Sequence, residues 1–248
     1  MDRIEFHCAG SYSELSPWQR EEICLRMEDD QRDFQELYRE MVLILLMGNP
    51  SRKNKKRVQR LLSEISIEQL LPLGKFLLTD RDLFSFPEIW DGLTTPLPRL
   101  SNCTIRQFSV ADMLFYQYSK KREELYARQL MASLYCWGAS EFDPLLLPKI
   151  AEVTDSISPG TRAAIVFAYR CTREYIIERY PAVFPKSSYR EDTPIFRRQG
   201  DYTPFSKVIA AMAMDSTQPL GNWHECSATR LYDFLEILNE SILRSKRT

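Results

Sequence analysis

Apolar side chains recur at steps of three and four along much of this chain, which is the spacing of one face of an α-helix. The clearest stripe predicts a helix over roughly residues 30–47, and Gly48 and Pro50 end it. The stripe covers one side only, so we expect that side to be buried. Its members are Phe34, Leu37, Tyr38, Met41, Val42, Leu45 and Leu46.

Start signals precede several of these periodic stretches. Ser16 and Ser66 are each followed three residues later by glutamine, which is the spacing of a capping box. Thr104 with Gln107 and the pair Ser158-Pro159 are similar signals. Further helices are predicted over residues 51–64, 66–78, 105–118, 120–136 and 159–180, from Pro204 and from Ser227, while Pro144 and Pro148 break the stretch between them.

Residues 3–15 alternate weakly between polar and apolar positions, through Ile4, Phe6 and Cys8, which is typical of a short strand. Taken with the helical stretches, this predicts an all-α protein of about eight to ten helices with a small N-terminal β element. Glycine is scarce, with eight residues in the chain, and this also disfavours glycine-rich nucleotide-binding folds.

A stretch rich in proline and turn residues suggests how the chain is divided. Residues 79–103 contain Pro87, Gly92, Pro96 and Pro98, so they are the best candidate for a linker. We expect an N-terminal helical subdomain over residues 1–78 and a C-terminal one over residues 104–248, unless the two form one domain. Residues 186–203 are polar and without a period, and predict an exposed loop.

Composition excludes several classes of function. The formal net charge of −1 provides no overall attraction to nucleic acid or to a membrane surface. No apolar run approaches the roughly 18 residues of a membrane span. Six cysteines stand at wide, irregular spacings, and the polar start of the chain is unlike a signal peptide, so we expect reduced thiols and a cytoplasmic location.

Candidate chemistry is sparse. The chain has two histidines and no GxSxG, P-loop, GxGxxG or HExxH motif. His7-Cys8 and His224-x-Cys226 offer zinc-ligand types, but neighbours on a strand point to opposite faces, so His7 and Cys8 cannot easily share a metal. Glu174 and Glu178 lie beside arginines on a predicted helix and are better explained as an intrahelical charge lattice. We therefore expect no catalytic, cofactor-binding or metal-binding residues.

A basic run opens the helix predicted over residues 51–64, with six basic residues and no acid between positions 52 and 60. A solvated helix start would explain it most simply, but cations at a helix N-terminus oppose the helix dipole. If the run is not simply solvated, it folds back onto the acid-rich residues 14–40, meets the acidic face of a second copy, or contacts a phosphate or an acidic partner. Nucleic acid is disfavoured because no aromatic residues interleave. The candidate partner-binding residues are Arg52, Lys53, Lys55, Lys56, Arg57 and Arg60.

Short motifs are spread along most of the chain: Ile4-Glu5-Phe6, residues 12–19, Phe108-Ser109-Val110-Ala111-Asp112, residues 130–135, Ala182-Val183-Phe184, residues 204–213 and Leu231-Tyr232-Asp233-Phe234-Leu235. In this order they resemble helical proteins from the tail-morphogenesis modules of tailed phages and prophages, some of which are tail assembly chaperones. The resemblance implies a non-enzymatic assembly factor that binds tape-measure or tube subunits in the host cytoplasm. The alternatives are a structural virion component, such as a connector or ring subunit that forms a homo-oligomer, and an enzyme of unknown type.

Overall fold

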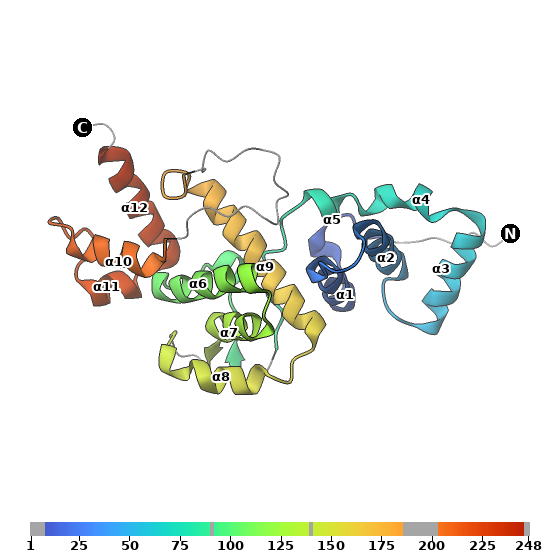
Figure 1. Ribbon diagram of the computed structural model, residues 1–248, viewed down its shortest axis with the longest axis horizontal. Coiled ribbons are helices and arrows are strands. Elements are labelled where there is room, and N and C mark those ends of the chain that lie inside the picture. Colours follow the sequence, from blue (N-terminus) through green and yellow to red (C-terminus); the bar gives the residue numbers. More distant parts are fainter. Residues whose placement is uncertain (1–7, 90–91, 139–140, 186–202, 246–248) are drawn as a thin grey trace. The chain divides into compact units, whose positions relative to one another are not determined.

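The computed structural model describes residues 8–89, 92–138, 141–185 and 203–245 (Figure 1). These residues form twelve α-helices and one two-stranded antiparallel sheet, which confirms the predicted all-α class with a small β element. The structure has more helices than the predicted eight to ten, partly because residues 66–78 form two short helices instead of one. Pro72 lies in the turn η2 (Leu71–Gly74), which separates α4 (Ile67–Leu70) from α5 (Phe76–Thr79).

The small sheet pairs β1 (Leu93–Thr94) with β2 (Cys136–Trp137), in the register Leu93 opposite Trp137 and Thr94 opposite Cys136. The sequence predicts a β element near the N-terminus instead. Of that segment, residues 8–15 contain the 3₁₀ turn η1 (Tyr12–Glu14), and residues 1–7 lie outside the described residues. The side chain of Tyr12 is fully buried, so this segment contributes to the core as a turn rather than as an alternating strand.

The chain divides into two compact units, and neither is contiguous in sequence. Unit 1 comprises residues 1–87 and 157–171, and unit 2 comprises residues 88–156 and 172–248. The helix α9 (Pro159–Arg179) crosses this division, since its residues up to Cys171 belong to unit 1. These bounds differ from the expected 1–78 and 104–248. The proline-rich residues 79–103 include the buried side chains of Leu83, Phe86 and Leu100, so burial continues through that stretch.

In unit 1, α1 (Pro17–Glu28) begins as predicted at a capping box. The hydroxyl oxygen of Ser16 accepts from the backbone N–H of Gln19, and the Gln19 side chain accepts from the N–H of Ser16. The amide nitrogen of Gln19 then donates to the carbonyl oxygens of Ile44 and Leu45, at 3.3 and 3.0 Å. These carbonyl oxygens lie in the last turn of α2 (Phe34–Met47). The buried side chain of Gln19 therefore takes part in the cap at the start of α1 and also bonds to the end of α2.

Tyr12 organises the core of unit 1. Its hydroxyl donates to the carbonyl of Leu77 at 2.9 Å, and its ring lies 5.5 Å from Phe76 and 5.3 Å from Phe167. The unit 1 part of α9 is also held by an ion pair between Arg170 and Glu28, at 2.7 Å, with both side chains largely buried. Residues from both ends of unit 1's sequence therefore meet in one core.

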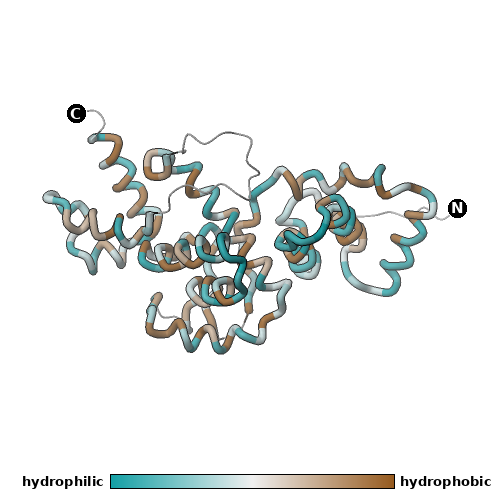
Figure 2. The backbone as a smooth tube through the Cα atoms, viewed as in Figure 1, coloured by the Kyte–Doolittle hydropathy of each residue, from teal (hydrophilic) through white to brown (hydrophobic). Residues whose placement is uncertain are grey.

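A second apolar cluster joins α2 to α3 (Arg52–Glu64) and α4. Its buried members are Val42, Leu46, Val58 and Leu70. Gly74 allows η2 to approach α2 closely, because a Cβ at this position would lie 2.8 Å from a methyl of Val42. Figure 2 shows the contrast between the hydrophobic residues of α2 and the largely hydrophilic α3.

In unit 2, α6 (Ile105–Lys121) is central. It begins at Thr104, as predicted, and contacts α7 (Glu124–Leu134), α10 (Phe205–Met214), α11 (Trp223–Ala228) and α12 (Leu231–Ser245). Gln107 repeats the role of Gln19, since its amide nitrogen donates to the carbonyl oxygens of Ser133 and Leu134 at the end of α7, both at 3.0 Å. The buried Asp112 of α6 forms an ion pair with Arg173 of α9.

Two sequence predictions for unit 2 need correction. The sequence predicts a last helix from Ser227, but α11 starts earlier, at a capping box between Asn222 and Glu225, and α12 starts at Leu231. Pro144 and Pro148 do not exclude helix: Pro148 lies in the first turn of α8 (Leu147–Thr154), which follows η4 (Pro144–Leu146). Of the loop expected over residues 186–203, all but Thr203 lies outside the described residues.

Candidate interaction surface

Helix α3 presents four of the predicted partner-binding residues on one side. Arg52, Lys53, Lys56 and Arg60 fall within about 100° of the helix circumference at 3.6 residues per turn, and all four are exposed. Val58, which is 5% exposed, lies on the opposite side and packs into the apolar cluster. We call these four residues the basic face of α3.

The two remaining candidates lie beside this face rather than on it. Lys55 is exposed and falls toward the side of Leu62, while Arg57 is half-buried and falls toward Leu61. Within the part of the chain that the structure describes, Arg52, Lys53, Lys55, Lys56 and Arg60 form no ion pair and no side-chain hydrogen bond. The structure therefore brings together four of the six predicted residues as one uncompensated surface.

The start of α3 is firmly anchored. The Ser51 hydroxyl caps the helix by accepting from the N–H of Asn54 at 3.2 Å. Asn54, the one uncharged residue among positions 52–57, donates from its amide to the carbonyl of Met47 and to the side chain of Asn49, at 2.9 and 3.0 Å. These bonds tie the first turn of α3 to the end of α2, so the basic face is held at a fixed position on the cluster beneath it.

Local electrostatics disfavour this arrangement. The first turn of α3 contains cations and no acid, and cations at a helix N-terminus oppose the helix dipole. Like charges four residues apart, as in Arg52 with Lys56 and Lys56 with Arg60, cost about 0.2–0.5 kcal/mol for each pair. The packing of Val58 and its neighbours offsets this cost, and the charges themselves do not contribute to the stability of the helix.

In the described part of the chain, the side chains of Arg52, Lys53, Lys55, Lys56 and Arg60 do not pair with the acid-rich segment 14–40. The acids there pair with other arginines, because these are interleaved in the same two helices. Arg26 pairs with Glu22 and Glu40, and Arg32 pairs with Glu40 and Glu36. The hydrogen bond from Arg32 is the main reason that the pKa of Glu40 is lowered. For these five residues, fold-back is therefore not what the structure shows.

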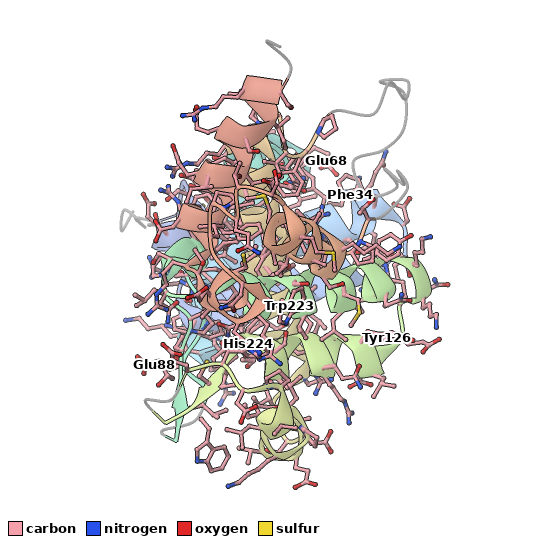
Figure 3. All side chains as sticks on the ribbon, turned by 90° about the vertical axis from the view of Figure 1, so that its left-hand side faces the viewer. Phe34, Glu68, Glu88, Tyr126, Trp223 and His224 are labelled. Atoms are coloured by element: carbon pink, nitrogen blue, oxygen red, sulfur yellow. The ribbon has the colours of Figure 1, made fainter. Side chains whose placement is uncertain are left out.

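The other sequence candidates are dispersed. His224 is exposed on α11 beside Trp223 (Figure 3), Cys226 is buried in the same helix, and Cys8 is half-buried in unit 1. His7 lies outside the described residues. In the described ranges, no group of three or more histidine, cysteine, aspartate or glutamate side chains is placed to hold a metal ion.

Large apolar side chains are exposed in both units, but they lie on different elements. In unit 1, Phe34, which is labelled in Figure 3, begins α2 and is 55% exposed. Its ring stacks on Tyr38, with the ring centres 6.2 Å apart. In unit 2, Leu145 of η4 and Met214 of α10 are more than 80% exposed. Single exposed apolar side chains are common on monomeric proteins. By themselves, these side chains do not make up the apolar groove that a chaperone would need.

The four cations of the basic face can attract an acidic surface, and the size of this effect follows from general electrostatics. Exposed ion pairs each contribute about 0–1 kcal/mol, so no single residue would carry binding. Together, cations of one sign attract an acidic surface and accelerate its association, and the effect falls as salt shortens the screening length.

No helix in the described part of the chain is both long and apolar enough to cross a membrane. Comparisons of the chain with models of protein families, with curated proteins and with solved structures find no match.

Proposed function

We propose that this protein is a non-enzymatic assembly factor that binds an acidic surface of a protein partner through the basic face of α3. One observation carries the proposal: four exposed cations share one side of a helix whose other side is buried in unit 1. Because these cations oppose the helix dipole and repel one another, folding does not account for them. Binding to an external partner would account for them.

The more specific form of the proposal is a tail assembly chaperone that acts in the host cytoplasm. It is supported by the resemblance of the motifs at residues 108–112, 130–135, 204–213 and 231–235 to helical tail-morphogenesis proteins of phages. The partners would then be tape-measure or tube subunits, which such a chaperone keeps soluble. The basic face would guide the encounter with them.

The test is co-expression of the tagged full-length chain with the tube subunit and the tape-measure protein of the same genome. Capture is measured at low and high salt. The test variant carries Lys53→Glu and Lys56→Glu. The matched control carries Lys75→Glu and Lys207→Glu, which change the net charge equally at exposed lysines outside α3.

We expect the α3 variant to bind about tenfold more weakly and the control to bind as the parent does. Equal capture of parent and α3 variant would contradict the role of the basic face. Failure to capture either client would contradict the chaperone form. A mass of many protomers by light scattering would favour the ring subunit instead, and binding to duplex DNA with a steep salt dependence would replace a protein partner by nucleic acid.

A further inference from the structure

The turn between α1 and α2 carries charge of the opposite sign to the basic face of α3. Asp29, Asp30 and Asp33 lie within five positions of one another, and in the part of the chain that the structure describes none of them forms an ion pair. Arg32, the cation between them, already pairs with two glutamates of α2. We call Asp29, Asp30, Asp33 and Phe34 the acidic turn.

Local hydrogen bonds hold the acidic turn in place without neutralising it. The carboxylate of Asp29 accepts from the backbone N–H of Gln31 at 3.1 Å, and that of Asp30 accepts from the side-chain amide of Gln31 at 2.8 Å. Asp33 caps α2 by accepting from two backbone N–H groups of its first turn, at 3.0 and 3.1 Å. All of these donors are uncharged, so three negative charges stay uncompensated at the surface.

An aromatic ring is exposed among these carboxylates. Phe34 follows Asp33 directly and is 55% exposed, although its ring stacks on Tyr38. Aromatic side chains are enriched in protein–protein interfaces and often anchor them. The stems of lysine and arginine are apolar, and their charged groups are attracted to the face of an aromatic ring. The basic face of α3 therefore offers both kinds of contact that the acidic turn lacks.

These two surfaces both belong to unit 1 but do not pair within the described residues of one copy. The acidic turn lies at the start of α2, and α3 follows the end of α2. The 14 residues of α2 span about 21 Å, since each residue of an α-helix adds about 1.5 Å. A second copy can instead place its acidic turn on the basic face of the first.

We propose that a second copy of this chain binds to the basic face of α3 through its acidic turn. The proposal rests on the first part of the proposed function, that the basic face binds an acidic protein surface, and it names one such surface. Each copy carries both surfaces, so a two-fold symmetric dimer forms the contact twice and leaves neither surface free. A client subunit would compete with the second copy for the same face.

The test is sedimentation equilibrium of the full-length protein at several concentrations, at low and at high salt. We expect the mass to rise with concentration from 29.1 kDa toward twice that value. High salt should weaken the dimer, because screening reduces the attraction between exposed charges. A single protomer at every concentration would overturn the proposal, and so would a mass above two protomers or a dimer that does not respond to salt.

Reversing the charges of one surface at a time makes the test specific. Lys53→Glu with Lys56→Glu changes the basic face. Asp29→Lys with Asp30→Lys changes the acidic turn, where the end of α1 favours cations. Each variant alone should dimerise about tenfold more weakly than the parent. An equal mixture of the two should recover the dimer, because one contact of the mixed pair is unchanged and the other again joins opposite charges. A contact within one copy, or a dimer through another surface, would not recover in this way.

Matched controls separate this effect from a general effect of charge. Lys75→Glu with Lys207→Glu, and Glu88→Lys with Glu152→Lys, make the same changes of net charge at exposed positions outside both surfaces. Both controls should dimerise as the parent does, and equal dimerisation by the α3 variant and its control would overturn the proposal.

Client capture distinguishes this inference from the proposed function. If the parent is monomeric and the α3 variant loses capture, the inference fails and the proposed function stands. If the dimer depends on both surfaces but the α3 variant captures clients as the parent does, the inference stands and the client role of the basic face fails.

Discussion

The amide nitrogen of Gln107 lies 3.0 Å from the carbonyl oxygen of Leu134, 27 positions further along the chain. In unit 1 the amide nitrogen of Gln19 makes the equivalent bond to Leu45, also at 3.0 Å and 26 positions away. Each glutamine follows a helix cap by three residues and satisfies carbonyls at the end of the next helix. In both units, a glutamine side chain near the start of one helix therefore bonds to the end of the next helix. We call this arrangement the glutamine clamp.

Replacing Gln107 by leucine should destabilise unit 2 at nearly constant side-chain volume. The carbonyls of Ser133 and Leu134 would lose their donor in a buried position, which costs about 1–3 kcal/mol. Urea unfolding followed by circular dichroism measures the change. Gln129→Leu, on the exposed side of α7, is the control and should change stability little. Equal stability of the two variants would show that the clamp contributes nothing.

Replacing Gly74 by alanine should destabilise the contact between η2 and α2. The new methyl group would lie 2.8 Å from a methyl of Val42 and 3.3 Å from the hydroxyl of Tyr38, which donates to the carbonyl of Leu71. Overpacking of this kind costs about 1–3 kcal/mol. Thermal unfolding would detect it, and Gly74→Ala combined with Val42→Ala should recover part of the loss that is due to the clash. A fully stable Gly74→Ala variant would mean that η2 moves away freely.

Replacing Lys53 by glutamate should stabilise the protein while weakening partner binding. The substitution places an acid in the first turn of α3, where the helix dipole favours it, and removes repulsion from Lys56. Together these effects amount to about 0.3–1 kcal/mol. The free energy of unfolding by urea measures it. A loss of stability in the Lys53→Glu variant would show that the basic face is part of the fold after all.

Stability should depend on the ionisation of Glu40. Arg32, and to a smaller extent Arg26, lower its pKa in the folded protein below the ordinary value of 4.5. A carboxyl with a lowered folded pKa contributes stability above its unfolded pKa, and this contribution disappears as the pH falls through the folded pKa. Glu40→Gln should therefore be less stable than the parent at pH 7, by about 0.2–1 kcal/mol for such a partly exposed pair. The difference should vanish in acid, and a difference that persists at pH 2 would contradict this origin.

Local signals in the sequence predict the helices well. The capping boxes at Ser16 and Ser66 and the caps at Thr104 and Ser158 are all in place, because each depends on residues within one turn. The signal for α11 is equally local, in Asn222 and Glu225, but the apolar stripe that follows it is the more conspicuous pattern and led to the later start at Ser227.

Contacts between residues that are far apart in the chain could not be predicted from the sequence. Nothing near Tyr12 in the chain indicates that Phe167 packs against its ring, since no period relates them. The contact between Arg179 and the ring of Tyr232 has the same character, because these two residues come from α9 and α12, which are far apart in sequence. The basic run on α3 was predictable for the opposite reason: its members are neighbours on a single helix.

The division of α9 restricts how this protein can be dissected or rearranged. A fragment that ends at Pro87 keeps Tyr12 and Glu28 but lacks Phe167 and Arg170, their partners in the core. No single cleavage can release either unit intact. Unit 1 could be rebuilt only by fragment complementation with a peptide of residues 157–171, or by circular permutation. A recombination event that exchanged one unit between related genes would have to replace two separate segments at once.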